Sequence, residues 1–169
     1  LQAHIRLAQQ VFPEKTNGAV LDGITRATLW NAGLDFGHGT GHGVGAFLGV
    51  HEGPQRISAF AADVGFQEGM VISSEPGFYR EGWGGIRLEN LYVVQPATAH
   101  PAHVDGKKWL CFDPLTLIPF DRSLVVAELL NSSERQWLRD YHTRVWEEIS
   151  PLLEEETERT WLRQACDWD

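Results

Sequence analysis

The chain has 169 residues, with 14 Lys or Arg against 23 Asp or Glu, so its formal net charge at pH 7 is −9. This acidity argues against nucleic acid or an anionic membrane as a partner, because both need clustered Lys and Arg, and no apolar run reaches the roughly 18–20 residues that span a bilayer. Hydrophobic residues make up 43% of the chain, and its two cysteines, Cys111 and Cys166, are too few for a disulfide scaffold, which favours a cytoplasmic location.

Two amphipathic helices are predicted near the start of the chain. Apolar residues recur at helical spacing over residues 1–12, and Pro13 closes this run. A second helix is predicted over residues 20–32, with Gly33 placed to end it in a left-handed conformation. Both have the pattern of packing elements.

A β-hairpin is predicted in the middle of the chain. Residues 70–79 and 86–94 have the composition of two strands, and the segment between them, residues 81–85, is rich in glycine. Two short β segments are expected further on, around residues 110–112 and 115–118.

The rest of the chain is predicted to be helical. Ser133 and Gln136 stand at capping-box spacing before an apolar stripe of helical period. A last, acidic helix is expected over residues 152–166. Residues 131–133 also match a glycosylation sequon, and we interpret them as a helix cap.

The hairpin brings two carboxylates together. Glu75 and Glu89 are equidistant from Gly82, so a turn centred there places them opposite each other on one face. Opposed like charges in apolar strands are costly, and a divalent cation between them removes the cost. Arg87 shares this face and could orient a ligating carboxylate. A solvated face with an Arg–Glu surface pair is the alternative, and a bulge at Pro76 would shift the register.

Three histidines accompany a segment in which every second residue, from position 37 to 45, is glycine. Neither a helix nor an ordinary strand favours this composition, so the backbone is expected to run close to another group. His38, His42 and His51 favour a functional site, because neutral imidazole is both a metal ligand and a proton carrier. His38 and His42 have the i, i+4 spacing of a zinc helix, but the glycines oppose a helix, so one ligand and one supporting histidine are expected.

The glycines also fit a phosphate-binding pattern. Residues 41–46 match G-x-G-x-x-A. No strand–turn–helix unit surrounds them and the sequence has no Gly-Lys-Ser/Thr, so nucleotide binding is not favoured.

Four motifs, in order and spacing, resemble aminopeptidase P, the Xaa-Pro aminopeptidase branch of the methionine aminopeptidase, prolidase and creatinase superfamily. They are HGTGHGVG at 38–45, VHEGP at 50–54, EPGFY at 75–79 and GIRLEN at 85–90. The tail, with FDPLTLIP at 112–119 and WL-x-x-YH at 137–142, is similar to the C-terminal extension of the longer aminopeptidases P. The step from His42 to His51 is longer than expected in a prolidase.

The resemblance implies an α/β (α+β) fold. Residues 1–108 would form the second half of a pita-bread catalytic domain, and residues 109–169 the C-terminal extension. It also implies two divalent metal ions, usually Mn2+, with Zn2+ or Co2+ as alternatives. The full-length protein would be a homodimer acting on peptides with proline at the second position.

The resemblance assigns a role to each candidate residue. His42 and Glu75 would ligate one metal, and Glu89 would bridge both. His38 and His51 would position the substrate and help to move protons, and Arg87 would be the partner of the ligands. A metal-bridging water would attack the carbonyl that precedes proline.

The resemblance further implies two aspartate ligands upstream of the first helix. Asp22 and Asp35 do not match that motif, and Leu1 stands where an initiator Met would be expected. We therefore expect these 169 residues to be a fragment that binds metal weakly and does not hydrolyse Xaa-Pro peptides by itself. Two alternatives stay open: a prolidase-type dipeptidase, and a non-catalytic creatinase-fold binding module, which the three intact ligands argue against.

Overall fold

The computed structural model describes residues 1–47, 49–61, 63–98 and 106–168. Contacts divide the chain into two units, Leu1–Thr116 and Leu117–Asp169. None of the helices in the described part is both long enough and apolar enough to cross a membrane.

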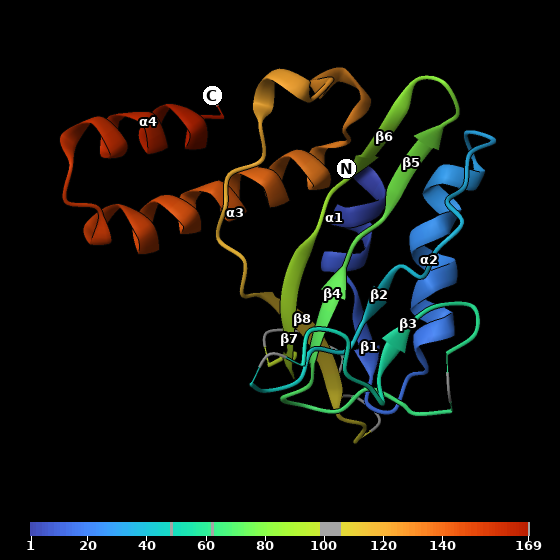
Figure 1. The fold of residues 1–169 in the computed structure, drawn as a ribbon. Coiled ribbons are helices and arrows are strands. Elements are labelled where there is room, and N and C mark those ends of the chain that lie inside the picture. Colours follow the sequence, from blue (N-terminus) through green and yellow to red (C-terminus); the bar gives the residue numbers. More distant parts are fainter. Residues whose placement is uncertain (48, 62, 99–105, 169) are drawn as a thin grey trace. The chain divides into compact units, whose positions relative to one another are not determined.

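The first unit is built around a sheet of four antiparallel strands in the order β1, β8, β7, β4 (Figure 1). These strands are β1 (Val11–Pro13), β8 (Trp109–Pro114), β7 (Asn90–Pro96) and β4 (Val71–Ser74). Helix α1 (Gln2–Ala8) packs against α2 (Gly18–Trp30), β4 and β8. The unit is therefore a mixed helix and sheet structure.

The core of this unit is aromatic. The ring of Phe112 lies 5.0 Å from that of Phe12, 6.1 Å from Phe66 and 5.9 Å from Tyr92, measured between centroids. All four side chains are buried, so they join β1, β7, β8 and the loop before β4 into one packed layer.

The expected hairpin forms, and it is longer than a simple pair of strands. Strand β4 continues into β5 (Gly77–Arg80), and β6 (Gly84–Arg87) continues into β7, as Figure 1 shows. The partners in β4–β7 and β5–β6 are all equidistant from Gly82, which has a positive φ of 73°. The register is therefore continuous across Glu75 and Pro76, and no bulge shifts it.

Two local predictions for the first unit were wrong at the ends of elements. Helix α1 ends at Ala8, because Val11–Pro13 pairs with β8 instead of extending the helix. One strand, β8, replaces the two short β segments expected after residue 109. The left-handed end of α2 is confirmed, since Gly33 has a φ of 71°.

The second unit is helical. It contains α3 (Ser132–Ile149), α4 (Glu156–Cys166) and three short 3-10 helices, η1 (Arg122–Leu124), η2 (Ala127–Leu129) and η3 (Ser150–Leu152). Its core is formed by Tyr141, Val145 and Leu162, between α3 and α4. The capping box at the start of α3 uses Asn131 and Glu134 rather than Ser133 and Gln136, because Asn131 is the residue that directly precedes the first turn.

Candidate metal centre

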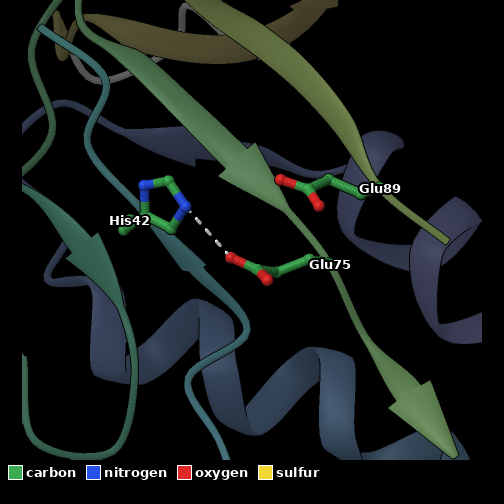
Figure 2. Close-up of side chains that lie close together, drawn as sticks. All are labelled: His42, Glu75 and Glu89. Carbon is green, nitrogen blue, oxygen red and sulfur yellow. Dashed lines mark ion pairs between the residues drawn. The ribbon is translucent and has the colours of Figure 1, made fainter. Parts of the chain in front are cut away.

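Three side chains of the first unit converge, as Figure 2 shows: His42, Glu75 and Glu89. One ligand atom from each lies within 4.8 Å of the others. A divalent ion holds N and O donors at about 2.0–2.2 Å, and hence up to about 4.4 Å apart. The three donor atoms are thus spaced nearly as they would be around one shared ion.

The hairpin positions the two glutamates. Glu75 lies between β4 and β5, and Glu89 lies between β6 and β7, opposite each other in the continuous register. The Glu75 side chain is 11% exposed, whereas Glu89 is exposed. A carboxylate as buried as Glu75 needs partners that compensate its charge.

The glycine-rich segment brings His42 to the glutamates. Strand β2 (Gly41–His42) pairs with β3 (Arg56–Ile57), and a bridge from Gly43 to Ile72 attaches it to β4. A Cβ on Gly41 would lie 1.9 Å from the carbonyl oxygen of Ser73. The backbone of the glycine-rich segment therefore runs close to β4, the strand that leads to Glu75, as expected.

The hydrogen bonds of His42 fit a metal ligand. Its Nδ1 lies 3.0 Å from the carbonyl oxygen of Gly43, and a carbonyl only accepts, so Nδ1 carries the proton. Its Nε2 then presents a lone pair to Oε1 of Glu75, 3.2 Å away. Two facing lone pairs repel, and only a second proton or a shared cation relieves this. A backbone carbonyl on the other ring nitrogen is also the usual support of a metal-bound histidine.

Two further groups hold the Glu75 carboxylate. The Ser73 hydroxyl donates to Oε1 at 3.1 Å and accepts from the His42 backbone N–H at 2.9 Å. Arg87 Nη1 donates to Oε2 at 3.2 Å. The predicted partnership of Arg87 with a candidate ligand thus has a direct counterpart, and the glutamate it contacts is Glu75.

His38 joins the site through Tyr79. Arg87 Nε donates to the Tyr79 hydroxyl oxygen at 2.9 Å, so this hydroxyl donates its own proton to His38 Nε2 at 2.8 Å. His38 Nδ1 therefore carries a proton and donates to the Gly39 carbonyl at 2.7 Å. The hydrogen bond with Tyr79, together with the nearby charges of Glu75 and Glu89, raises the pKa of Arg87 above its ordinary value.

Tyr79 was missed by the sequence analysis. It belongs to the quoted EPGFY motif, and strand alternation places residues 75, 77 and 79 on one face. That alternation, applied beyond Glu75, would have identified it.

A cavity of about 450 Å³ is lined by most of the candidate site residues. It is lined by His38, His42, His51, Glu75 and Arg87, among others. The ring of His51 lies 4.2 Å from that of His42, between centroids, in an edge-to-face arrangement. The exposed His51 ring is therefore directly beside the candidate ligand and accessible from the cavity.

Asp22 and Asp35 support the glycine-rich segment instead of the metal centre. Buried Asp22 accepts from the Thr40 hydroxyl at 2.6 Å and from Arg26 Nε at 2.8 Å. Arg26 also donates to the carboxylate of Asp35 and to the backbone carbonyl of Phe36, both at 2.7 Å. Helix α2 thus fixes the segment that leads to His38.

A buried histidine, His4, contacts residues next to the two glutamates in the sequence. Its Nε2 is 2.9 Å from the Tyr92 hydroxyl, and its Nδ1 is 3.4 Å from the Ser74 hydroxyl. Burial lowers the pKa of His4 to about 3, although a hydrogen bond with the Leu88 backbone acts in the opposite direction. His4 therefore connects, as a neutral ring, the residues that precede Glu75 and Glu89.

Comparison with known proteins identifies relatives along the whole chain. The model of metallopeptidase family M24 matches residues 1–96, and the model of the C-terminal region of this peptidase family matches residues 108–168. Aminopeptidase P2 of Arabidopsis thaliana is 50% identical over 163 residues, which are 96% of this chain and 23% of the relative. Xaa-Pro aminopeptidase 1 of Dictyostelium discoideum is 42% identical over 168 residues, 96% of this chain and 26% of the relative.

The structures show the same similarity. The X-prolyl aminopeptidase of Caenorhabditis elegans, described as a cytosolic enzyme with a di-nuclear active site, superposes with a TM-score of 0.90 and 41% identity. The match covers 98% of this chain and 27% of that structure, so the described fold corresponds to part of that structure. The prolidase of Pyrococcus horikoshii matches 56% of this chain, with a TM-score of 0.50 and 35% identity. The chain spans about a quarter of the length of the relatives it matches.

Proposed function

The chain belongs to metallopeptidase family M24, and from this premise we propose that the full-length protein removes the N-terminal residue from peptides with proline at the second position. The observation that carries the proposal is the convergence of His42, Glu75 and Glu89 in a chain that aligns over nearly its whole length with Xaa-Pro aminopeptidases. A prolidase-type dipeptidase is supported less well, because the prolidase match leaves out much of the chain.

Two divalent metal ions form part of the proposal. His42 and Glu75 would hold one ion, and Glu89 would bridge both. We favour Mn2+, because a set dominated by carboxylates suits this harder ion, whereas Zn2+ or Co2+ would suit a set with more imidazole. When bound, the ions supply Lewis-acid polarisation of the scissile carbonyl and stabilise the negative charge that develops on its oxygen.

The side chains around the ligands orient the reacting groups. Arg87 and Ser73 hold the Glu75 carboxylate from its two oxygens, so its direction toward His42 does not depend on the ion alone. His51 lies on the open side of His42, where it can contact a peptide and accept or donate a proton. His38, fixed as the Nδ1-protonated tautomer, is placed to position the substrate through the same cavity.

The remaining ligands would come from outside these 169 residues. Asp22 and Asp35 are engaged with Arg26, so we propose that two more carboxylates are supplied by another part of the protein. On this proposal the 169 residues, residues 1–108 as the second half of the catalytic domain and 109–169 as the extension, do not hydrolyse Xaa-Pro peptides alone.

Location and assembly are further parts of the proposal. The Caenorhabditis elegans enzyme is described as cytosolic, and we propose a cytoplasmic location for the full-length protein as well. A homodimer formed through the C-terminal extension is part of the same proposal, and equilibrium sedimentation of the full-length protein tests it.

The test of function uses the full-length protein, stripped of metal and reloaded with Mn2+. We expect Ala-Pro-Ala to be cleaved and Ala-Ala-Ala to be left intact. Glu89→Gln should lower activity by more than about 100-fold, because changes to groups that merely support ligands already cost 10–100-fold. Glu81→Gln, an exposed change in the same hairpin, is the control. Full activity of Glu89→Gln, or equal cleavage of both peptides, would contradict the proposal.

A further inference from the structure

The candidate metal cavity contains a second arginine that the metal centre does not use. Arg56 of β3 is the cross-strand partner of His42, and it lines the same cavity. Directly opposed residues of an antiparallel pair have Cβ atoms about 4.5–5.5 Å apart on one face. Burial alternates accordingly: Gly41 and Ile57 face the interior, whereas His42 and Arg56 face the cavity. The guanidinium is thus carried on the same face as a candidate ligand.

The cavity lining includes two carboxylates, Glu52 and Glu75, and neither is paired with Arg56. Glu75 is held by His42, Ser73 and Arg87. The carboxylate of Glu52 is directed at the glycine-rich segment, because a Cβ on Gly45 would lie 1.9 Å from its Oε2. Neither carboxylate forms a hydrogen bond or ion pair with Arg56 in the part of the chain that the structure describes.

Arg56 differs from Arg87 in this respect. Arg87 has Tyr79 and Glu75 as partners, whereas the Arg56 guanidinium has no hydrogen bond or ion pair with any residue in the part of the chain that the structure describes. An exposed cation without a partner, on the wall of a cavity, is available to a ligand. Its planar fork suits a carboxylate, with which it forms paired, charge-assisted hydrogen bonds.

We propose that Arg56 forms a subsite that binds a carboxylate of the peptide substrate, and this rests on the proposed aminopeptidase function. The first candidate is the C-terminal carboxylate of a tripeptide, which follows the reacting carbonyl by two residues that span about 7 Å when extended. An acidic side chain after the proline offers the same chemistry. The subsite would make this enzyme select short or acidic peptides among those with proline at the second position.

The experiment compares four peptides with the full-length protein. Ala-Pro-Ala and its C-terminal amide test the terminal carboxylate, and Ala-Pro-Glu amide and Ala-Pro-Gln amide test an acidic side chain. Dissociation constants are measured by calorimetry on metal-free protein, and KM and kcat on protein loaded with Mn2+. The variants are Arg56→Gln, Arg56→Lys, and Arg80→Gln as a matched charge change in the hairpin, outside the cavity lining.

The expected result is about tenfold tighter binding of one carboxylate peptide over its neutral counterpart, equivalent to about 1.4 kcal/mol. Arg56→Gln should abolish this preference for the carboxylate peptide by changing KM. The kcat of the variant should stay within about twofold of the wild-type value. Arg56→Lys should retain part of the ratio, and Arg80→Gln all of it. The pair of peptides that responds identifies the source of the carboxylate.

The two proposals fail in different ways. If Arg56→Gln changes the dissociation constant and KM of all four peptides equally, or of none, the carboxylate subsite is wrong while the aminopeptidase function stands. If no peptide is cleaved but binding still depends on Arg56 and the carboxylate, the subsite stands and the proposed function is wrong.

Discussion

Gly41 provides a direct test of how β2 holds the candidate metal centre. A Cβ at this position would lie 1.9 Å from the Ser73 oxygen, and ordinary contacts begin at 3.4 Å, so Gly41→Ala must separate β2 from β4 by roughly 1.5 Å. Overpacking of this kind costs about 1–3 kcal/mol. The bonds from His42 N–H to the Ser73 hydroxyl and from Glu75 N–H to the Thr40 carbonyl depend on this spacing, and each is worth about 0.5–1.5 kcal/mol.

We therefore expect Gly41→Ala to lower the free energy of unfolding of the full-length protein by about 2–6 kcal/mol. Its affinity for Mn2+ should fall more than about tenfold, because His42 moves away from the glutamates. Urea unfolding followed by tryptophan fluorescence measures the first quantity, and titration calorimetry the second.

Gly37→Ala is the matched control. Among the described residues, no atom lies within 4 Å of a Cβ at Gly37, and its φ is not positive. Alanine should therefore be neutral or stabilise by about 0.4–1 kcal/mol. If Gly41→Ala behaves like Gly37→Ala in both measurements, the close contact with Ser73 is not what positions His42.

Three further outcomes are expected. Arg87→Lys should lower the affinity for Mn2+ about tenfold, because lysine cannot contact Tyr79 and Glu75 with one fork; unchanged affinity in calorimetry would exclude this role. Because the pKa of His4 is about 3 in the folded chain, the unfolded chain binds a proton at His4 at a higher pH than the folded chain does. The contribution of His4 to stability is therefore complete above pH 6.5 and falls by about 1.4 kcal/mol per pH unit below it, toward pH 3. Urea midpoints at pH 7.5 and 5.5 should therefore differ less for His4→Gln than for wild type, and equal differences would contradict this. Burial also lowers the pKa of His142, so its contribution to the stability of the protein should likewise fall as the pH falls. His142→Gln should therefore reduce the difference between the urea midpoints at pH 7.5 and 5.5.

The hairpin could be predicted from the sequence because its information is local. Symmetry about Gly82 was sufficient to oppose Glu75 and Glu89, and strand alternation would have added Tyr79. By contrast, β1 was assigned to a helix because the strand that pairs with it, β8, is remote in the sequence. Hydrophobic spacing alone cannot distinguish three such residues from a last helical turn.

Long-range contacts also limited the prediction of the site. The alternating glycines indicated close packing, but the partner of Gly41 was revealed only by the structure. The unpaired state of Arg56 likewise depends on where Glu52 and Glu75 point. The carboxylate ligands that we propose for another part of the protein lie outside what these residues can specify.

The register about Gly82 also has a consequence for folding. Glu75 and Glu89 meet through a local hairpin, an element that forms in about 1–10 μs, whereas His42 reaches them only through β2 and its bridge to Ile72. Non-local contacts form later because they require the closure of longer loops. We therefore expect the carboxylate pair to be assembled before the imidazole joins it. Ser73, which bonds the Glu75 carboxylate and the backbone N–H of His42, is where the late strand would dock on the early one.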